Sequence, residues 1–567
     1  MAPTSFSPMT VPLFLVVLVV WYNPASAFHS TVTSASSSLR RRHLDNDIIS
    51  LPSRLLPFKT KAADEDTATE PIIGTVALLV PSSSMTISKF GSKSPISPPS
   101  YIEVAQQLVR KIRHFSDGRI IATIISPDDD TTSSSLAISS DALFAIGLTS
   151  PSDIQYLSRT FRERRTLGRR SSCQFAIDCG TNRYEPIVGP YDAANPSPIA
   201  SLAPWSDVAS GKRLMAQMSR LFEEYSTDEF ALATMLHFNQ FSGHKVPWVE
   251  HTIDVTWEKG PIRNAKELAG MISKCGPCIA TCLSDDNCSA CIKALDKIDT
   301  RDQVSSYRTI VSYESKLLQD FTLCILTKND VFGCRAIIPT LPQVIPTTTW
   351  RGREMTTELS RQILIGHLSG VAEESSPEGS RQLDVSWKVS CGANAAYDQF
   401  PSQNQLFYPT AGSGSKDLWY DPVFRVETLD GRNVWCKRHY RVRCGKVPGT
   451  FRFTVLDNGV TSDEFWTIIG AADDLSWVLF HYAGAAAAVG QRYIGGLLCT
   501  PDGSLPPPED LNEIWRIFRS AEIEPWELFV VDNEETTSGA LAAGPPPLNY
   551  YRTTVEAKRK PSAAIIS

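Results

Sequence analysis

Cysteines are the residues of this chain whose number and spacing point most clearly to chemistry. The 567-residue sequence contains 13 cysteines. Seven form one cluster, at Cys275, Cys278, Cys282, Cys288, Cys291, Cys324 and Cys334, and four follow further on, at Cys391, Cys436, Cys444 and Cys499. In an oxidising compartment such a density indicates structural disulfide bonds, although their connectivity cannot be deduced from the sequence. Because seven is odd, at least one thiol of the cluster stays reduced or bonds outside it.

Two other chemistries fit parts of the same cluster. The sequence Cys275-Gly276-Pro277-Cys278 has the spacing of a thioredoxin-type redox motif, but that motif lies at a helix start after a strand, and the residues before Cys275 form a poor strand. Zinc could be held by the pairs 275/278 and 288/291, although the gap between them is short for a zinc ribbon and Cys282 interrupts it. Disulfides are therefore the preferred interpretation, and no metal is expected.

The elements that follow the cluster have the pattern of a β-barrel. Apolar and polar residues alternate in short runs, which predict strands at 383–390, 422–428, 433–444, 450–456, 464–469, 476–482 and 492–499, with a shorter eighth at 405–408. Turn residues separate them, including Asp457-Asn458-Gly459. About eight strands close into a barrel that can hold one small ligand. A helix is predicted at 508–520, and strands followed by one helix are the lipocalin order.

The residues of this region resemble a known family. The stretch Trp387–Phe407, the runs Phe465–Ile469 and Trp477–Tyr482, the pair Gly495-Gly496 and the segment Leu505–Asn533 are similar to the corresponding parts of violaxanthin de-epoxidases. The resemblance covers roughly residues 272–533 and is greatest to the de-epoxidase-related or -like branch of algae with complex plastids. It implies a lipocalin-like eight-stranded antiparallel barrel with a C-terminal helix. It also implies a xanthophyll as the ligand, ascorbate as the reductant, and a thylakoid membrane surface as a further partner.

The resemblance also implies site residues. Asp398 matches the first carboxylate of the family and is the candidate catalytic residue. The candidate substrate contacts are Tyr397, Phe400, Gln403, Phe407 and Tyr493. The second carboxylate of the family aligns with Arg492, so the paired acids needed to protonate an epoxide oxygen are incomplete. An alternative is a salt bridge between Asp398 and Arg492, which would lower the pKa of the acid.

Two functions therefore stand side by side. The first is an enzyme that de-epoxidises or rearranges a xanthophyll epoxide. The second is a non-catalytic carotenoid-binding protein that has lost the carboxylate pair. Both predict a pigment-sized apolar cavity in the barrel. The net charge of −6 shows no excess of basic residues, which argues against a nucleic-acid partner.

The part of the chain before the cysteines predicts a separate α/β domain at 71–260. Strands are expected at 75–80, 119–125 and 143–148 and near 173–179, with helices from Ser100 to Phe115 and from 150 to 165. Residues 126–140 are polar and are predicted to be a surface loop. The fold class is thus α+β and multidomain: an α/β domain of unknown role, a disulfide-rich helical module at 265–340 and a barrel domain at 382–533.

The two ends of the sequence have compositions of their own. Residues 1–27 are predicted to be a signal peptide, with an apolar core and the small residues Ala25-Ser26-Ala27 at its end. Residues 28–62 are rich in Ser and Arg and poor in acids, as in a plastid transit segment. Together they predict a plastid protein of the thylakoid lumen, with plain secretion as the alternative. Residues 534–567 are predicted to be a disordered tail.

Overall fold

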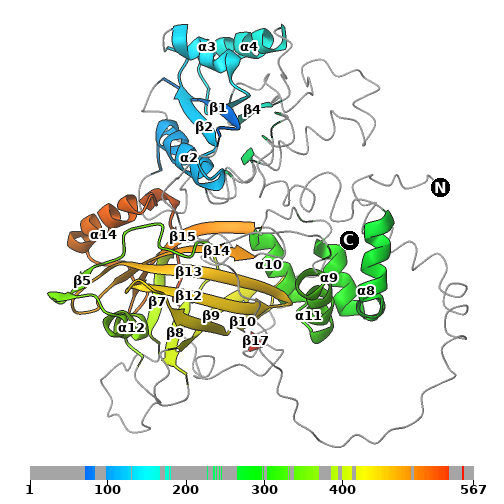
Figure 1. The fold of residues 1–567 in the computed structure, drawn as a ribbon, viewed down its shortest axis with the longest axis vertical. Coiled ribbons are helices and arrows are strands. Elements are labelled where there is room, and N and C mark those ends of the chain that lie inside the picture. The colour runs from blue at the N-terminus through cyan, green and yellow to red at the C-terminus, as the bar shows by residue number, and fades with distance from the viewer. Residues whose placement is uncertain are drawn as a thin grey trace, which may run out of the picture.

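The computed structural model describes residues 71–82, 98–128, 131–166, 173–177, 179, seven single positions between 227 and 244, 265–295, 298, 303–329, 331, 338–368, 385–393, 399–410, 417–486, 491–534 and 552–553. Its described elements form an α/β domain, a helical module and a β-barrel (Figure 1). The predicted fold class is therefore confirmed. The predicted targeting segments lie outside the described residues.

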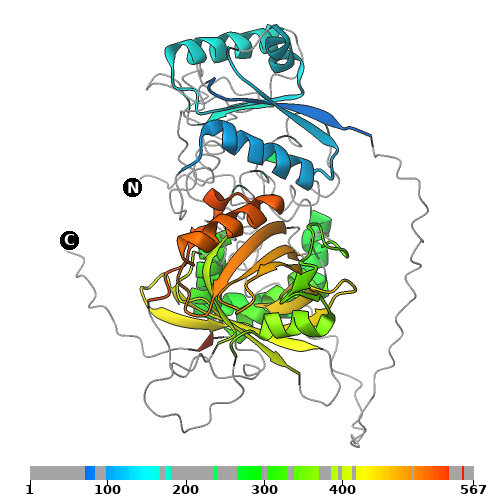
Figure 2. The ribbon, with the colours of Figure 1, turned by 90° about the vertical axis from the view of Figure 1, so that its left-hand side faces the viewer.

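The α/β domain has a parallel four-stranded sheet in the order β2-β1-β3-β4. Its strands are β1 (Gly74–Leu79), β2 (Ile120–Ile125), β3 (Ala142–Ile146) and β4 (Gln174–Ile177), and its helices are α2 (Tyr101–Phe115), α3 (Thr131–Ser139) and α4 (Pro151–Thr166). Successive residues of a strand face opposite sides of the sheet. Leu78 and Phe144 therefore pack towards α2, while Leu79 and Leu143 pack on the α3 and α4 side. The result is a three-layer domain (Figures 1 and 2).

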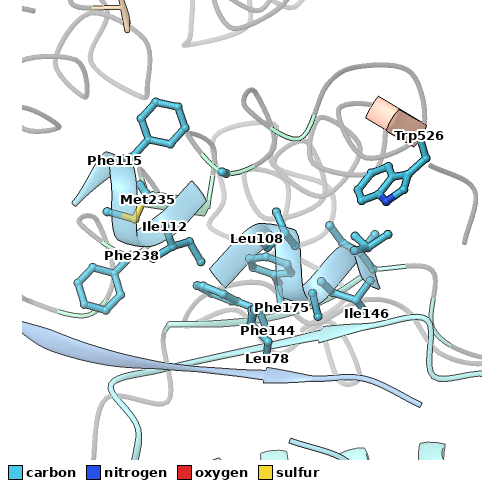
Figure 3. Packing of buried hydrophobic residues seen from close by; sticks show 14 of the residues in the cluster. Leu78, Leu108, Ile112, Phe115, Phe144, Ile146, Phe175, Met235, Phe238 and Trp526 are labelled. Carbon is cyan, nitrogen blue, oxygen red and sulfur yellow. The ribbon is translucent and has the colours of Figure 1, made fainter. Parts of the chain in front are cut away.

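Helix α2 begins where the sequence predicts it. Ser100 accepts a hydrogen bond from the backbone N–H of Glu103, and the Glu103 carboxylate accepts one from the N–H of Ser100. This reciprocal capping box satisfies two amides that the helix itself cannot bond. Leu108 and Ile112 then pack against Phe144 and Phe175 of the sheet (Figure 3).

The predicted loop at 126–140 is wrong, because the structure has helix α3 there. Ala137 is fully buried against the sheet and α4. Arg164 of α4 donates hydrogen bonds to the carbonyl oxygens of Ala137 and Ser140, at 2.8 and 2.9 Å. These bonds satisfy carbonyls at the C-terminal end of α3, where a helix leaves its own acceptors without partners. Tertiary contacts thus stabilise a helix that the polar local sequence does not predict.

The helical module contains α8 (Ala265–Ser284), α9 (Asp286–Leu295), α10 (Gln303–Ser312), α11 (Lys316–Thr322) and a π-helical turn at Leu323–Lys328. Arg438, a fully buried residue of the barrel, lies 2.9 Å from Asp457 of the barrel and 3.2 Å from Glu314, just before α11. Its guanidinium also lies over the ring of Tyr307 of α10. A buried ion pair of this kind fixes one relative position, because moving either partner would leave a buried charge uncompensated.

Eight antiparallel strands close the barrel. The closed order is β7-β8-β9-β11-β12-β13-β14-β15 and back to β7. The strands are β7 (Trp387–Gly392), β8 (Asn404–Pro409), β9 (Leu418–Glu427), β11 (Tyr440–Cys444), β12 (Thr450–Asp457), β13 (Val460–Ala471), β14 (Val478–Ala486) and β15 (Gln491–Thr500). The β12–β13 turn has positive φ at both Asn458 and Gly459, as the sequence predicts for a tight hairpin.

One predicted strand is divided. Instead of a single strand at 433–444, the structure has β10 (Asn433–Lys437) and β11, separated by Arg438 and His439. Both segments pair with the long strand β9, β10 with its second half and β11 with its first half. Because the strand is broken here, the side chain of Arg438 points into the protein and forms the buried ion pairs with Glu314 and Asp457. Strand β17 (Arg552–Thr553), within the predicted tail, pairs with the other edge of β10.

Further elements cover the barrel. Helix α12 (Thr357–Ile365) follows the short hairpin β5 (Thr349–Trp350) and β6 (Arg353–Glu354), and its Leu359 and Ile363 pack in the barrel core. Trp387 of β7 donates to the carbonyl oxygen of Ile363 at 3.0 Å. Helix α14 (Pro508–Ser520) packs through Ile514 and Phe518 on the outer side of the barrel wall, and a 3₁₀ turn (Pro525–Glu527) and β16 (Phe529–Val530) follow it. The predicted C-terminal helix is confirmed.

Candidate functional site

A buried glutamate is the most unusual polar group of the barrel interior. Glu464 of β13 is 6 % exposed and lines a cavity inside the barrel. Trp466, two residues further along the same strand, donates from Nε1 to Oε2 of Glu464 at 2.6 Å. The hydroxyl of Tyr493 on β15 donates to Oε1 at 2.7 Å. Both carboxyl oxygens are therefore held in place by donors from the barrel wall.

The second of these bonds crosses an intervening strand. In the sheet register Glu464 of β13 lies opposite Gly484 of β14, and Gly484 lies opposite Tyr493 of β15. A Cβ atom at position 484 would collide with the ring of Tyr493. The glycine is thus needed here for space, because it lets the tyrosine ring lie over β14 and reach the carboxyl group.

Burial changes the proton affinity of the carboxyl group. Desolvation disfavours the ionised form and raises the pKa of Glu464 above its ordinary value of 4.5, and the nearby Asp463 raises it further. The hydrogen bonds from Trp466 and Tyr493 favour the ionised form and partly oppose this rise. A carboxyl group with a raised pKa that lies in a cavity can donate a proton to a bound oxygen atom.

The cavity beside Glu464 is small and partly polar. Its volume is about 40 Å³, which is room for a few water molecules. The lining residues come from seven strands or their edges: Val389, Gln403, Gln405, Tyr420, Pro422, Tyr440, Glu464, Trp466, Tyr482 and Leu497. Pockets for drug-sized molecules have volumes of roughly 300–1,000 Å³. The pigment-sized cavity expected from the sequence is therefore not found at this place in the structure.

Aromatic side chains fill the remainder of the interior. Phe407 stacks on Tyr420 with the ring centres 4.5 Å apart, and Phe453 lies 4.5 Å from Trp466. Phe407 and Phe453 are fully buried. Any ligand larger than the cavity must displace some of these rings.

Three residues predicted from the resemblance lie at this site or in its walls. Gln403 lines the cavity, and its side chain also donates to the carbonyl oxygen of Phe400 at 3.1 Å. Phe407 belongs to the core that fills the barrel. Tyr493 contacts Glu464 directly.

Phe400 and Arg492 lie away from the cavity. Phe400 packs with Tyr307 and Phe424 in a hydrophobic cluster separate from the barrel core. Tyr397 and Asp398 lie outside the described residues. Arg492 points away from the interior and forms an ion pair with Asp117 of the α/β domain, at 3.6 Å.

Glu464 itself is absent from the residues predicted by the resemblance. A signal for it is present in the sequence, since Glu464, Trp466 and Ile468 alternate along one strand and share a face. An acidic residue on the apolar face of a strand is the pattern that marks a buried, functional carboxyl group. The sequence does not show which face of the strand points inwards.

The cysteine cluster forms two disulfide bonds among the described residues. Cys275 bonds to Cys324, with Cα atoms 5.9 Å apart, and Cys282 bonds to Cys288, with Cα atoms 5.2 Å apart. Disulfide formation is thus present for four of the predicted candidates in the module, and the prediction is wrong for Cys278 and Cys291. Cys278 and Cys291 are thiols, and burial raises the pKa of Cys291 to about 12. Cys334 lies outside the described residues, and Cys391, Cys436, Cys444 and Cys499 form no disulfide with another described residue.

In the part of the chain that the structure describes, no group of three or more His, Cys, Asp or Glu side chains is placed to hold a metal ion. Nor does any described helix have the length and apolar character needed to cross a membrane.

Comparison with known proteins places the second half of the chain. Residues 267–533 match the family described as VDE lipocalin domain, and this part of the chain therefore belongs to the violaxanthin de-epoxidase family. Among solved structures, lipocalin 12 from rat epididymis is similar at 12 % identity and a TM-score of 0.22, over 35 % of this chain and 96 % of that one. No curated protein matches the sequence.

Proposed function

We propose that this chain, a member of the violaxanthin de-epoxidase family through its residues 267–533, binds a xanthophyll epoxide at the barrel and that Glu464 donates a proton to the epoxide oxygen. The observation that carries the proposal is the buried carboxyl group of Glu464, held by Trp466 and Tyr493 beside a cavity. Barrels of this size commonly take one small apolar ligand.

The chemistry of de-epoxidation needs such a group. Removing the epoxide oxygen breaks two C–O bonds, leaves an alkene and releases the oxygen as water. The step consumes two protons and two electrons. Ascorbate supplies the electrons in our proposal and becomes dehydroascorbate. A carboxyl group whose pKa is raised keeps its proton at a pH where an exposed glutamate has lost it, and can protonate the oxygen as the C–O bond breaks.

The size of the cavity sets a condition on this proposal. The volume of about 40 Å³ beside Glu464 accommodates the oxygen-bearing end of a ligand and not the body of a xanthophyll. Binding therefore requires rings such as those of Phe407, Tyr420 and Trp466 to change their positions. We expect this rearrangement to appear as a change in tryptophan fluorescence when the pigment binds.

A second function is favoured by the composition of the cavity wall. Among the residues that line the cavity, Glu464 is the one carboxyl group, and the position of Asp398 lies outside the described residues. A barrel with a single acid supports a non-catalytic carotenoid-binding protein of the same family. In that case Glu464 would hydrogen-bond the oxygen of a bound pigment without transferring its proton.

One experiment separates the two functions. The oxidised protein is incubated with violaxanthin and ascorbate at mildly acidic pH, and the pigments are separated by chromatography. Conversion to a de-epoxidised or rearranged pigment that is lost in Glu464→Gln supports the enzyme. Pigment that co-purifies unchanged supports the binding protein. If the pigment neither binds nor changes, both proposals are wrong. Glu513→Gln, at an exposed carboxyl group of α14 on the outer side of the barrel, serves as the matched control.

The location in the cell is also a proposal. We place the protein in the plastid, in the thylakoid lumen and near the membrane surface, on the basis of the Ser- and Arg-rich residues 28–62 behind the apolar segment of residues 1–27. A fusion of residues 1–62 to a fluorescent protein tests this assignment. Fluorescence in the secretory pathway instead of the plastid would contradict it.

A further inference from the structure

Helix α2 binds the segment of chain that follows α14. Gln107, a fully buried residue of α2, donates from Nε2 to the carbonyl oxygen of Glu522 at 2.9 Å and also to the carboxylate of Glu527. Arg110, one turn further along α2, lies 2.6 Å from Glu524. Figures 1 and 2 show α2 between the four-stranded sheet and the barrel, with α14 below it. The α/β domain is therefore docked on residues 522–527.

Buried groups make this contact specific. Lys111 lies 3.9 Å from Glu527, and their side chains are 8 and 3 % exposed. The hydroxyl of Thr227 also donates to Glu527. Trp526 is buried and belongs to one hydrophobic cluster with Leu108 of α2 (Figure 3). A buried ion pair and a buried ring are satisfied in one relative position of the two parts of the chain.

The residues that follow belong to the barrel. We call residues 522–533 the linking segment. Its strand β16 pairs with β7, and the next residue, Val531, packs in the barrel core. The three residues from Trp526 to Phe529 span at most about 11 Å, so the segment has little slack between the α/β domain and β7.

The linking segment ends on the wall of the barrel cavity. The backbone N–H of Ser402 donates to the carbonyl oxygen of Asp532 at 2.6 Å, and that of Gln403 donates to Oδ1 of Asn533 at 3.0 Å. Nδ2 of Asn533 in turn donates to the carbonyl oxygen of Val389 at 2.7 Å. Gln403 and Val389 both line the cavity. One asparagine therefore holds two neighbouring parts of the cavity wall.

The backbone of this wall needs support. Ser402 has a φ of 61°, in the left-handed region that is unfavourable for a residue with a side chain. Its hydrogen bond to Asp532 holds it there. Phe400, two residues earlier, belongs to the same hydrophobic cluster as Trp526. If these contacts were lost, Ser402 could relax to a more favourable φ, and Gln403 would move with it.

We propose that the docked α/β domain positions the Gln403 side of the barrel cavity through the linking segment, with Asn533 as the positioning residue. The α/β domain holds residues 522–527, and residues 529–533 hold the cavity wall. Docking of this domain and binding of a ligand that fits the held wall are then coupled, and each favours the other to the same degree. The coupling can be measured without a pigment, so the proposal does not depend on the proposed function.

Hydrogen–deuterium exchange of the full oxidised chain at neutral pH, followed by mass spectrometry, tests the connection. Arg110→Glu places a second carboxylate beside Glu524, and we expect the amides of residues 522–528 and 399–405 to exchange roughly tenfold faster. Arg110→Glu with Glu524→Arg should restore both rates. The amides of β12 should keep the wild-type rate in each variant, which separates a local release from a general loss of stability.

Arg162→Glu is the matched control for the change of charge, because Arg162 is an exposed residue of α4, on the other side of the sheet from α2. Arg519, the other cation near Glu524, is half exposed and can turn to solvent in the double reversal. If Arg110→Glu does not fold, Arg110→Gln removes the ion pair without adding a charge. It should change the exchange in the same direction and by less.

Asn533→Ala tests the barrel end of the linking segment. We expect residues 399–405 to exchange roughly tenfold faster in this variant, while α2 keeps its wild-type rate. Asn512→Ala, at an exposed asparagine of α14, is the matched control. Unchanged exchange of residues 399–405 in Asn533→Ala would show that Asn533 is not the positioning residue.

Violaxanthin binding, followed by tryptophan fluorescence, gives a readout of the cavity itself. Arg110→Glu and Asn533→Ala are expected to raise the Kd roughly tenfold, and the double reversal of Arg110 and Glu524 to restore it. If the wild type binds no violaxanthin, the proposed function is wrong, and hydrogen exchange alone decides the present proposal.

The exchange rates in Arg110→Glu give the decisive outcomes. Faster exchange of both residues 522–528 and residues 399–405, reversed by Glu524→Arg, supports the proposal. Faster exchange of residues 522–528 with an unchanged rate for residues 399–405 would overturn it. Wild-type rates in both segments, or fast exchange that persists in the double reversal, would overturn it as well.

Discussion

The hydroxyl of Tyr493 on β15 donates a 2.7 Å hydrogen bond to Glu464 on β13, across the glycine that separates them on β14. This bond joins two strands that are not neighbours. The residue before Tyr493 is Arg492, which faces the other way and pairs with Asp117 of the α/β domain. Consecutive residues of one strand therefore contact the buried acid on one side of the barrel wall and the neighbouring domain on the other.

Removing the tyrosine hydroxyl is expected to raise the pKa of Glu464. The hydrogen bond from Tyr493 favours the ionised carboxylate, so Tyr493→Phe shifts the pKa further upwards. Loss of the bond should also lower the free energy of unfolding by about 1 kcal/mol. Titration of the carboxyl group followed by infrared spectroscopy measures the first effect, and urea unfolding the second. Tyr156→Phe, in the α/β domain, should leave the titration as it is. A lowered or unchanged pKa in Tyr493→Phe would disagree with the geometry.

Gly484 is expected to tolerate no side chain. The Cβ atom of Gly484→Ala would occupy the position of the Tyr493 ring, which must move away from Glu464. We expect a loss of about 1–3 kcal/mol in the free energy of unfolding. Gly270→Ala is the control, because nothing lies within 4 Å of a Cβ atom placed there and alanine suits its helix. Equal stability of the two variants would show that the ring does not need this space.

Glu464 is expected to make the barrel less stable as the pH rises. Its pKa in the folded state lies above the ordinary value of 4.5, so above pH 4.5 the folded state retains a proton that the unfolded state has lost. Stability therefore falls with increasing pH through this range, until the folded carboxyl group is ionised as well. In Glu464→Gln this part of the pH dependence disappears. Unfolding free energies measured in urea from pH 4 to 8 test the difference, and parallel curves for the two proteins would refute it.

The two disulfide bonds are expected to contribute unequally. Cys275 and Cys324 are 49 residues apart, whereas Cys282 and Cys288 are 6 apart. The loop-entropy relation assigns about 4 kcal/mol to the longer loop and about 2 kcal/mol to the shorter one. The paired variants Cys275→Ser with Cys324→Ser and Cys282→Ser with Cys288→Ser, compared by thermal unfolding, test this order. A larger loss from the shorter bridge would reverse it.

The sequence correctly predicted those elements that are stabilised by interactions between residues close together in the chain. The capping box at Ser100 and the Asn458-Gly459 turn formed as expected because each depends on residues that are neighbours in the chain. The alternating strands of the barrel were predicted for the same reason. Helix α3 was missed because Arg164, a distant residue, satisfies its carbonyl groups.

The site is formed by contacts between strands, which cannot be predicted from the sequence of a single strand. Glu464 is a site residue because β13 turns its face inwards and because Gly484 and Tyr493 meet it in register. The division of 433–444 at Arg438 likewise follows from Glu314 and Asp457, which lie far from it in sequence. The resemblance predicted Tyr493 and Gln403 as site residues. In the structure Gln403 lines the cavity, and Tyr493 donates a hydrogen bond to Glu464.

The most direct test of the account is the titration of Glu464 itself. Infrared difference spectra between the wild type and Glu464→Gln isolate the carbonyl band of this carboxyl group as the pH is raised. We predict that the protonated band persists to a pH clearly above 4.5, the ordinary value for glutamic acid. A band that disappears at or below that pH would contradict the presence of a buried proton donor in the barrel.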